Sequence, residues 1–136
     1  MLRTAILAAA ALSFVNVASA QCATVTAANN AGEISIDLDG SDPMRFAFVV
    51  LGDTQGTTPI NLGNFASFDL GLAAPFVPAP LGLTDMNGDA SLTFTPPTTA
   101  PAGTYYVQGV TVGFDIVPGT GLSLDVCVSD VASFAL

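Results

Sequence analysis

The chain has 136 residues, of which 11 are acidic and two are basic, and none is a histidine, so its formal net charge is −9. A surface this negative repels phosphate backbones and anionic lipid, which argues against nucleic-acid binding and favours cations as charged partners. The absence of histidine excludes a Ser-His-Asp triad, a histidine proton shuttle and imidazole zinc sites.

Residues 1–20 have the layout of a secretory signal peptide. Arg3 precedes an apolar run, and Ala18 and Ala20 occupy the small-residue positions of an A-x-A cleavage site. Residues 21–136 then have the length of a single domain and are too few for two ordinary ones. The apolar run is shorter than the ~20 residues of a membrane span, and no later segment reaches that length. We therefore expect a secreted protein (extracellular, periplasmic or at the cell surface) without a transmembrane helix.

The two cysteines, Cys22 and Cys127, lie close to the two ends of the expected mature chain. Exported compartments are usually oxidising, so we expect the pair to form a disulfide. Closing a loop of about 100 residues stabilises a fold by ~4.7 kcal/mol in the chain-entropy account. The alternative is a lipoprotein, acylated on Cys22 after cleavage just before it. That processing favours a small residue before the cysteine, and Gln21 is not small.

Strand-like alternation and turn residues dominate the mature chain, whereas helical periodicity is hard to find. The first predicted strand covers residues 22–27. The second covers residues 33–38, where apolar and polar residues alternate as in a half-buried strand. A more deeply buried strand follows at residues 44–51, and then a polar loop at residues 52–59. Residues 65–70 are favoured as the next strand.

The segment at residues 71–80 contains three prolines, which cannot donate ladder hydrogen bonds, and is predicted to be an extended crossover loop. The dipeptide Asn87-Gly88 predicts a hairpin between strands at residues 81–86 and 89–95, because both residues tolerate the positive φ of a type I′ turn. A two-residue turn also fixes the pairing register. It would place four side chains on one buried face: Leu81, Leu83, Leu92 and Phe94.

Further strands are predicted at residues 104–112 and 122–129, and a short last strand runs toward Leu136. About eight short strands without helical crossovers predict an all-β fold. The expected architecture is an antiparallel two-sheet β-sandwich of immunoglobulin-like or jelly-roll type.

Two acidic loops have the oxygen-rich composition that calcium prefers. Asp85, Asn87 and Asp89 occupy the first, third and fifth positions of an EF-hand-like loop, but Ala90 replaces the turn glycine and Pro96 the bidentate glutamate. An ordinary turn explains this loop as well. We therefore favour a turn and expect no cofactor, with calcium as the alternative. The same two interpretations apply to a second loop, which contains Asp37, Asp39 and Asp42.

The sequence predicts no catalytic constellation, and we expect a protein that is not an enzyme. Asp53-Thr54-Gln55-Gly56 differs from the Asp-Thr-Gly of aspartic proteases by the inserted Gln55, and it occurs once, whereas two such aspartates must share a proton. Glycosidases need two carboxylates across a cleft, and the spacing of Glu33 and the aspartates suggests no pair. Paired cysteines would leave no thiolate nucleophile.

The stretch from Gly82 to Leu92, followed after a proline loop by Gly103-Thr104-Tyr105-Tyr106-Val107-Gln108, resembles β-rich modules common in exported proteins of environmental bacteria. Those modules carry a Thr-Asp-x-x-Gly-x-Ala hairpin and then a Gly-x-x-(Phe/Tyr)-Tyr-x-Gln strand. The similarity covers roughly residues 80–130. It implies a sandwich and a structural signature, and it implies no defined activity.

These observations favour a non-catalytic exported module, which is a structural, adhesive or binding domain with a protein or glycan surface as its partner. The alternative is a carbohydrate-binding module, with calcium assistance if an acidic loop holds the ion. Such modules usually stack sugars on aromatic side chains, and the chain has no tryptophan. Of its two tyrosines, Tyr105 and Tyr106, at most one can face solvent on a given sheet face.

Overall fold

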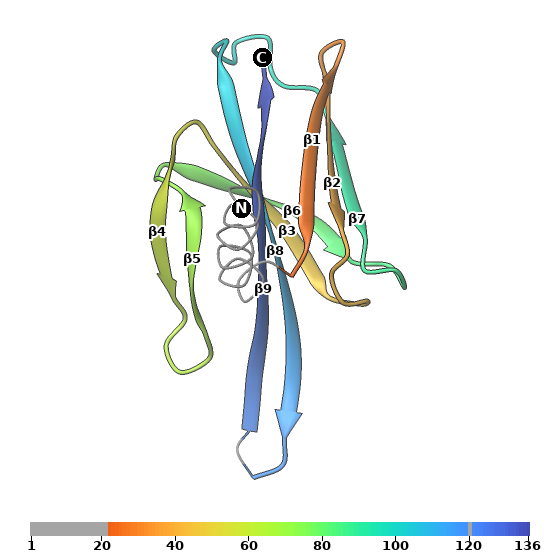
Figure 1. Cartoon of the computed structure of the whole chain (residues 1–136), viewed down its shortest axis with the longest axis vertical. Helices are drawn as coiled ribbons and strands as arrows, with labels where there is room; N and C mark the ends of the chain where they lie inside the picture. Colours follow the sequence, from red (N-terminus) through yellow and green to blue (C-terminus); the bar gives the residue numbers. More distant parts are fainter. Residues whose placement is uncertain (1–21, 120) are drawn as a thin grey trace, which may run out of the picture.

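The computed structural model describes residues 22–119 and 121–136, and in these ranges the chain forms nine antiparallel strands and no helix (Figure 1). The all-β prediction is thereby confirmed, and the signal peptide expected at residues 1–20 lies outside the described residues. None of the described segments has the helical length and apolar character of a membrane span. The strands are β1 (Thr24–Asn30), β2 (Glu33–Asp39), β3 (Phe46–Gly52), β4 (Gln55–Asn61), β5 (Ser67–Leu72), β6 (Phe76–Leu83), β7 (Ala90–Phe94), β8 (Thr104–Val117) and β9 (Gly121–Ala135).

The strands are arranged in three sheets. One sheet has the order β1-β2-β7, a second has the order β6-β3-β8-β9, and β4 pairs with β5 alone. Figure 1 shows the three-stranded sheet and the β4–β5 hairpin on opposite sides of the four-stranded sheet. The hairpin adds a sheet to the two that were predicted, because β4 forms from residues whose polar composition predicts a loop.

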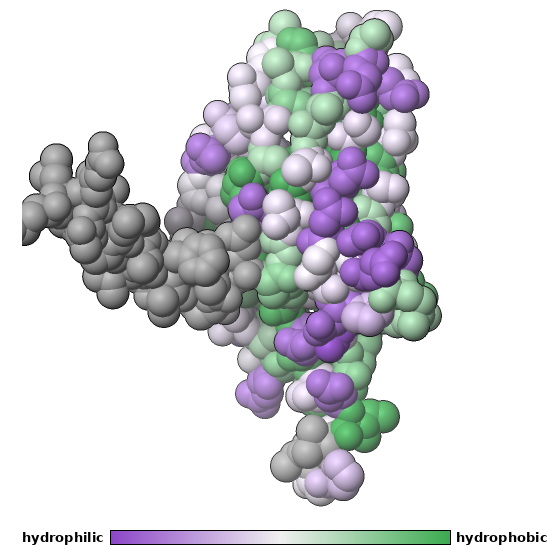
Figure 2. Space-filling view, turned by 45° about the vertical axis from the view of Figure 1, so that its right-hand side comes forward, coloured by the Kyte–Doolittle hydropathy of each residue, from purple (hydrophilic) through white to green (hydrophobic). Residues whose placement is uncertain are grey.

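The first core cluster lies between the three-stranded and four-stranded sheets. Ile34, Ile36 and Leu38 of β2 are fully buried, as their alternation predicts, and they face Val49 and Val107 of the four-stranded sheet. The intervening residues of β2 point outward. Figure 2 accordingly shows hydrophilic side chains along the side of the molecule that β1, β2 and β7 form.

The second core cluster lies on the other face of the four-stranded sheet. Val50 of β3 and Val110 of β8 pack there against Leu70 and Leu72 of β5. Successive residues of a strand point to opposite faces, so Val49 and Val50 belong to different clusters. Strands β3 and β8 are therefore covered on both faces.

The predicted crossover loop at residues 71–80 is wrong over most of its length, because Phe76–Leu83 forms strand β6. Two of its prolines, Pro78 and Pro80, pair with β3 opposite Val50 and Phe48. Strand β6 is an edge strand with a single neighbour. Proline is tolerated in such a strand because its missing N–H would point to solvent.

The predicted hairpin pairing is also wrong. Strand β6 pairs with β3 and strand β7 pairs with β2, so the turn at Asn87-Gly88 connects two different sheets. The Gly88 N–H donates to the Asp85 carbonyl at 3.0 Å, and Gly88 has the positive φ expected of the turn, 80°. The predicted type I′ turn is wrong as well, because Asn87 does not have a positive φ and the Gly88-to-Asp85 hydrogen bond makes Met86 and Asn87 the central residues of the turn. A tight turn also does not decide which strands pair beyond it.

Three of the four side chains predicted for the hairpin core do pack against the first core cluster, and they are partly buried: Leu81, Leu92 and Phe94. Leu83 differs from them, because it is 56% exposed and lies beside Phe46. The β3–β6 register shifts between Ala47 and Phe48, which leaves Leu81 as an extra residue in β6, so Leu81 and Leu83 lie on different faces of the sheet.

We predict that Gly88→Ala destabilises the fold more than Gly32→Ala. Both glycines have positive φ, which costs an alanine roughly 1–2 kcal/mol. A Cβ at Gly88 would also overlap the Ser41 carbonyl oxygen, whereas nothing lies near a Cβ at Gly32. Overpacking of this kind adds about 1–3 kcal/mol. Urea unfolding of the two variants measures the difference, and equal losses would contradict the close approach of the two loops.

Candidate functional site

The acidic loop between β6 and β7 uses its carboxylates to hold its own backbone. Asp85 Oδ1 accepts hydrogen bonds from the N–H groups of Asn87 at 2.8 Å and Asp89 at 3.0 Å. Asp89 Oδ1 accepts from the N–H of Gly40 at 3.1 Å. These oxygens face backbone amides instead of converging on one centre. In residues 22–119 and 121–136, no three acidic or cysteine side chains gather as a metal site would require.

The second acidic loop is likewise tied to neighbouring groups. Asp42 forms an ion pair with Arg45, with 3.2 Å between Asp42 Oδ2 and the guanidinium nitrogen. Asp37 and Asp39 are exposed on the outer side of β2. The three aspartates therefore have separate surroundings.

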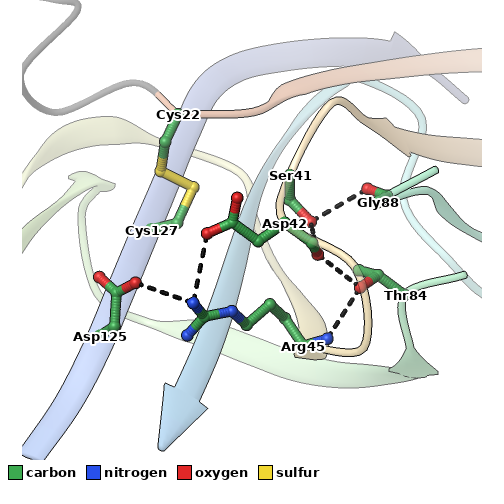
Figure 3. A network of polar contacts seen from close by, with 8 residues as sticks. All are labelled: Cys22, Ser41, Asp42, Arg45, Thr84, Gly88, Asp125 and Cys127. Carbon is green, nitrogen blue, oxygen red and sulfur yellow. Dashed lines mark hydrogen bonds and ion pairs between the residues drawn. A yellow bond between two sulfur atoms is a disulfide. The ribbon is translucent and has the colours of Figure 1, made fainter. Parts of the chain in front are cut away.

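A disulfide and an arginine lie next to each other at one side of the fold (Figure 3). Cys22 and Cys127 are bonded, with their Cα atoms 5.6 Å apart, and this confirms the predicted pair. Arg45 bridges two carboxylates, Asp42 and Asp125, at 3.2 Å from each. The bridge joins the β2–β3 connection to β9, next to the disulfide. A cavity of about 80 Å³ lies among these side chains and is too small for anything larger than a few water molecules.

Two residues outside the ion pairs determine the position of Arg45: Thr84 bonds to its backbone, and Gly113 leaves space for its side chain. The Thr84 hydroxyl is buried, donates to the Asp42 carbonyl at 2.8 Å and accepts from the Arg45 N–H at 2.9 Å. Gly113 lies beneath the arginine, and a Cβ there would overlap the guanidinium. Arg45 therefore fits on β8 because Gly113 has no side chain.

Two side chains of the motif at residues 103–108, Tyr105 and Gln108, also form hydrogen bonds with other parts of the fold. The Gln108 side chain is buried, donates from Nε2 to the Ser129 carbonyl at 2.8 Å and accepts at Oε1 from the Gly71 N–H at 2.8 Å. It thus connects β5 to β9 across β8. The Tyr105 hydroxyl donates to the Pro101 carbonyl at 2.7 Å. Together with Thr84, these side chains stabilise connections between strands.

An apolar groove of about 350 Å³ lies at the end of the fold where the C-terminus is seen in Figure 1. Residues from the ends of five strands (β3, β6, β7, β8 and β9) line the groove. Four of these residues are aromatic: Phe76, Phe94, Tyr105 and Phe134. Tyr105 stacks on Phe134 with ring centroids 5.8 Å apart, and Phe94 meets Phe134 edge to face at 6.5 Å. One carboxylate, Asp53, is among the lining residues.

The sequence did not predict this groove as a site. The pattern that could have indicated the groove is a set of aromatic residues next to proline-containing connections. Phe76 follows Pro75, Phe94 lies two residues before Pro96, and Tyr105 lies four residues after Pro101. The expectation for the tyrosines fits the structure, because Tyr105 packs with the first core cluster and Tyr106 with the second.

We predict that reducing the Cys22–Cys127 disulfide lowers the free energy of unfolding by about 2–5 kcal/mol, because the bond closes almost the whole described chain. Urea unfolding with and without reductant measures this loss. The double variant Cys22→Ser/Cys127→Ser should match the reduced protein. Two thiols that react with an alkylating agent before reduction would contradict the pairing.

We predict that calcium and magnesium at equal ionic strength raise the melting temperature equally, relative to a chelator. Both ions screen the repulsion within a chain of net charge −9. The Oδ1 atoms of Asp85 and Asp89 are hydrogen-bonded to backbone amides, and no third acidic side chain of the described residues gathers with them as a calcium cage would require. A shift specific to calcium would instead favour a bound ion in one of the two acidic loops.

Comparison with known proteins found no protein-family model, no curated protein and no solved structure that matches this chain. The proposed function therefore rests on the fold and on the apolar groove.

Proposed function

We propose that the chain is a non-catalytic exported binding or adhesive module whose apolar groove accepts an apolar ligand. The observation that carries the proposal is the groove itself. Its volume of about 350 Å³ falls in the ~300–1,000 Å³ range of ligand pockets, and its lining is aromatic and aliphatic, as is usual for such sites. The ligand is an apolar group, either a small molecule or an apolar side chain presented by a partner.

The chemistry of the groove supports binding over catalysis. Asp53 is the carboxylate among its lining residues, whereas acid–base hydrolysis by carboxylates needs two. The Tyr105 hydroxyl is engaged with the Pro101 carbonyl. Export is supported by the signal-like residues 1–20 together with the disulfide, which persists in oxidising compartments.

For the fold we propose a two-sheet sandwich of immunoglobulin-like type, with the β4–β5 hairpin as an addition. The order β1-β2-β7 corresponds to strands A, B and E of that fold, and the order β6-β3-β8-β9 corresponds to C′, C, F and G. Tyr105 near the start of β8 supports the same assignment. Its hydroxyl bonds to the backbone four residues upstream, as in the tyrosine corner at the start of strand F.

A carbohydrate-binding module is the alternative, and the gathering of four aromatic side chains in the groove is the observation that favours it. Sugars also need hydrogen-bonding groups around an aromatic platform. The groove offers few of these, since its lining is mainly apolar and its tyrosine hydroxyl is already engaged. An apolar ligand therefore ranks first.

We predict that the neutral apolar dye Nile red binds the folded protein saturably, and that Ala100→Phe weakens this binding at least about tenfold. Ala100 lines the groove, so a phenyl group there occupies the space of the ligand. The matched control is Ala102→Phe, which adds the same group to an exposed position of the same loop.

Fluorescence titration of the three proteins decides between the outcomes. Equal affinities in both variants would contradict binding in the groove. A glycan array that shows binding lost in Ala100→Phe and kept in Ala102→Phe would replace the apolar ligand with the carbohydrate alternative.

A further inference from the structure

Strands β8 and β9 continue beyond the rest of their sheet as a two-stranded arm. The pairing of β3 with β8 ends at Phe46 and Val112, whereas β8 and β9 remain paired as far as Val117 and Gly121. We call residues 113–119 and 121–125 the arm, and Figure 1 shows the ends of β8 and β9 projecting at the end opposite the C-terminus. No other described strand pairs with the arm.

One face of the arm is apolar. Directly paired residues share a face, so Phe114 with Leu124 and Ile116 with Leu122 form this face. Phe114 is 63% exposed, Ile116 83% and Leu122 47%. In Figure 2, hydrophobic residues reach the surface at the lower end of the molecule, where the arm projects.

The apolar face continues onto the four-stranded sheet. Leu83, Phe46 and Val112 lie side by side across β6, β3 and β8, and Phe46 is half exposed. Farther along the sheet, the same face is covered by the β4–β5 hairpin, which packs on it as the second core cluster. We call the uncovered part the apolar arm face, which comprises Phe46, Leu83, Phe114, Ile116 and Leu122.

The charged groups of the arm lie on its other face. Asp115, Ser123 and Asp125 alternate with the apolar residues and therefore point away from the apolar arm face. Arg45 pairs with Asp125 on that opposite side. The arm is thus amphipathic, with one face free of carboxylates.

The apolar arm face is large for an isolated surface. Its five members are 47–83% exposed and together present on the order of 500 Å² of surface. That is at the upper end of the ~300–600 Å² of the largest patch on a typical monomer. It is also more than half of the ~800 Å² that each partner contributes to a standard interface.

We infer that the apolar arm face binds a second copy of this chain, in a two-fold symmetric dimer that packs the two arms face to face. A two-fold interface joins the same patch on both subunits, so an apolar patch is its own complement. Each arm would cover the other at the ~10 Å spacing of packed sheets, as the β4–β5 hairpin covers the neighbouring part of the same face.

Charge placement favours a second copy over an anionic partner. Two chains of net charge −9 repel each other at a distance, but face-to-face packing leaves Asp115 and Asp125 on the outside of the dimer. Nucleic acid or anionic lipid would meet the full negative field without any basic residue on the patch to offset it. The groove lies at the other end of the fold, so this inference does not depend on the proposed function.

Sedimentation velocity of the oxidised mature protein at micromolar concentration tests the dimer. The expected result is a dimer that strengthens with salt, because screening reduces the repulsion between the copies. Ile116→Asp should raise the dimer dissociation constant at least about tenfold, since it places two carboxylates in the interface. Ile116→Ser should weaken the dimer to a smaller extent, because it removes apolar contact without adding charge.

The matched control is Ser123→Asp, which adds the same charge to the same arm on its opposite face and should leave the dimer intact. Circular dichroism and urea midpoints check that every variant is folded. A monomeric wild-type protein at high salt overturns the inference, as does equal weakening by Ile116→Asp and Ser123→Asp. Co-flotation of a monomeric wild-type protein with neutral phosphatidylcholine vesicles would assign the face to a membrane surface instead.

Discussion

The four-stranded sheet carries apolar side chains on both of its faces, and the other sheets pack on it so that these side chains are buried. Neighbouring residues Val49 and Val50 of β3 are both buried, in clusters on opposite faces. The three-stranded sheet covers one face, and the β4–β5 hairpin covers part of the other. Burial of both faces is what a strand with little polar alternation requires, because an uncovered side would expose apolar area to water. Where the hairpin ends, the same sheet face continues uncovered onto the arm.

Local patterns in the sequence predicted the features that depend on near neighbours. The alternation of Ile34, Ile36 and Leu38 indicated which face of β2 is buried, and the two cysteines indicated the disulfide. Long-range pairing could not be obtained in this way. A turn such as the one at Met86 and Asn87 reverses the chain locally, but it does not determine that β6 pairs with β3 and β7 with β2.

A bulge in β9 shows a second limit of periodicity. Between Val128, which faces Val110, and Val131, which faces Gln108, β9 has one residue more than its partner, and so the alternation changes phase there. Cys127 and Phe134 therefore pack with the same cluster although one is odd and the other even in number. The Ser129 hydroxyl holds the bulge by accepting from the Gly109 N–H at 2.8 Å. The groove is missed for a different reason, because its aromatic lining comes from strand ends that lie far apart in sequence.

The placement of Arg45 has a consequence for proteolysis. Apart from Arg3, it is the one basic residue of the chain, so proteases that cleave after lysine or arginine find a single bond to attack in residues 22–136. That bond leads directly into β3, and the arginine is held by Thr84, Asp42 and Asp125 instead of lying in an exposed loop tip, where nicking concentrates. If it is cut, Cys22 lies on one fragment and Cys127 on the other, so the disulfide keeps the two pieces joined. A domain exposed to trypsin-like enzymes outside the cell would therefore stay covalently whole after the one cleavage of this kind that its sequence permits.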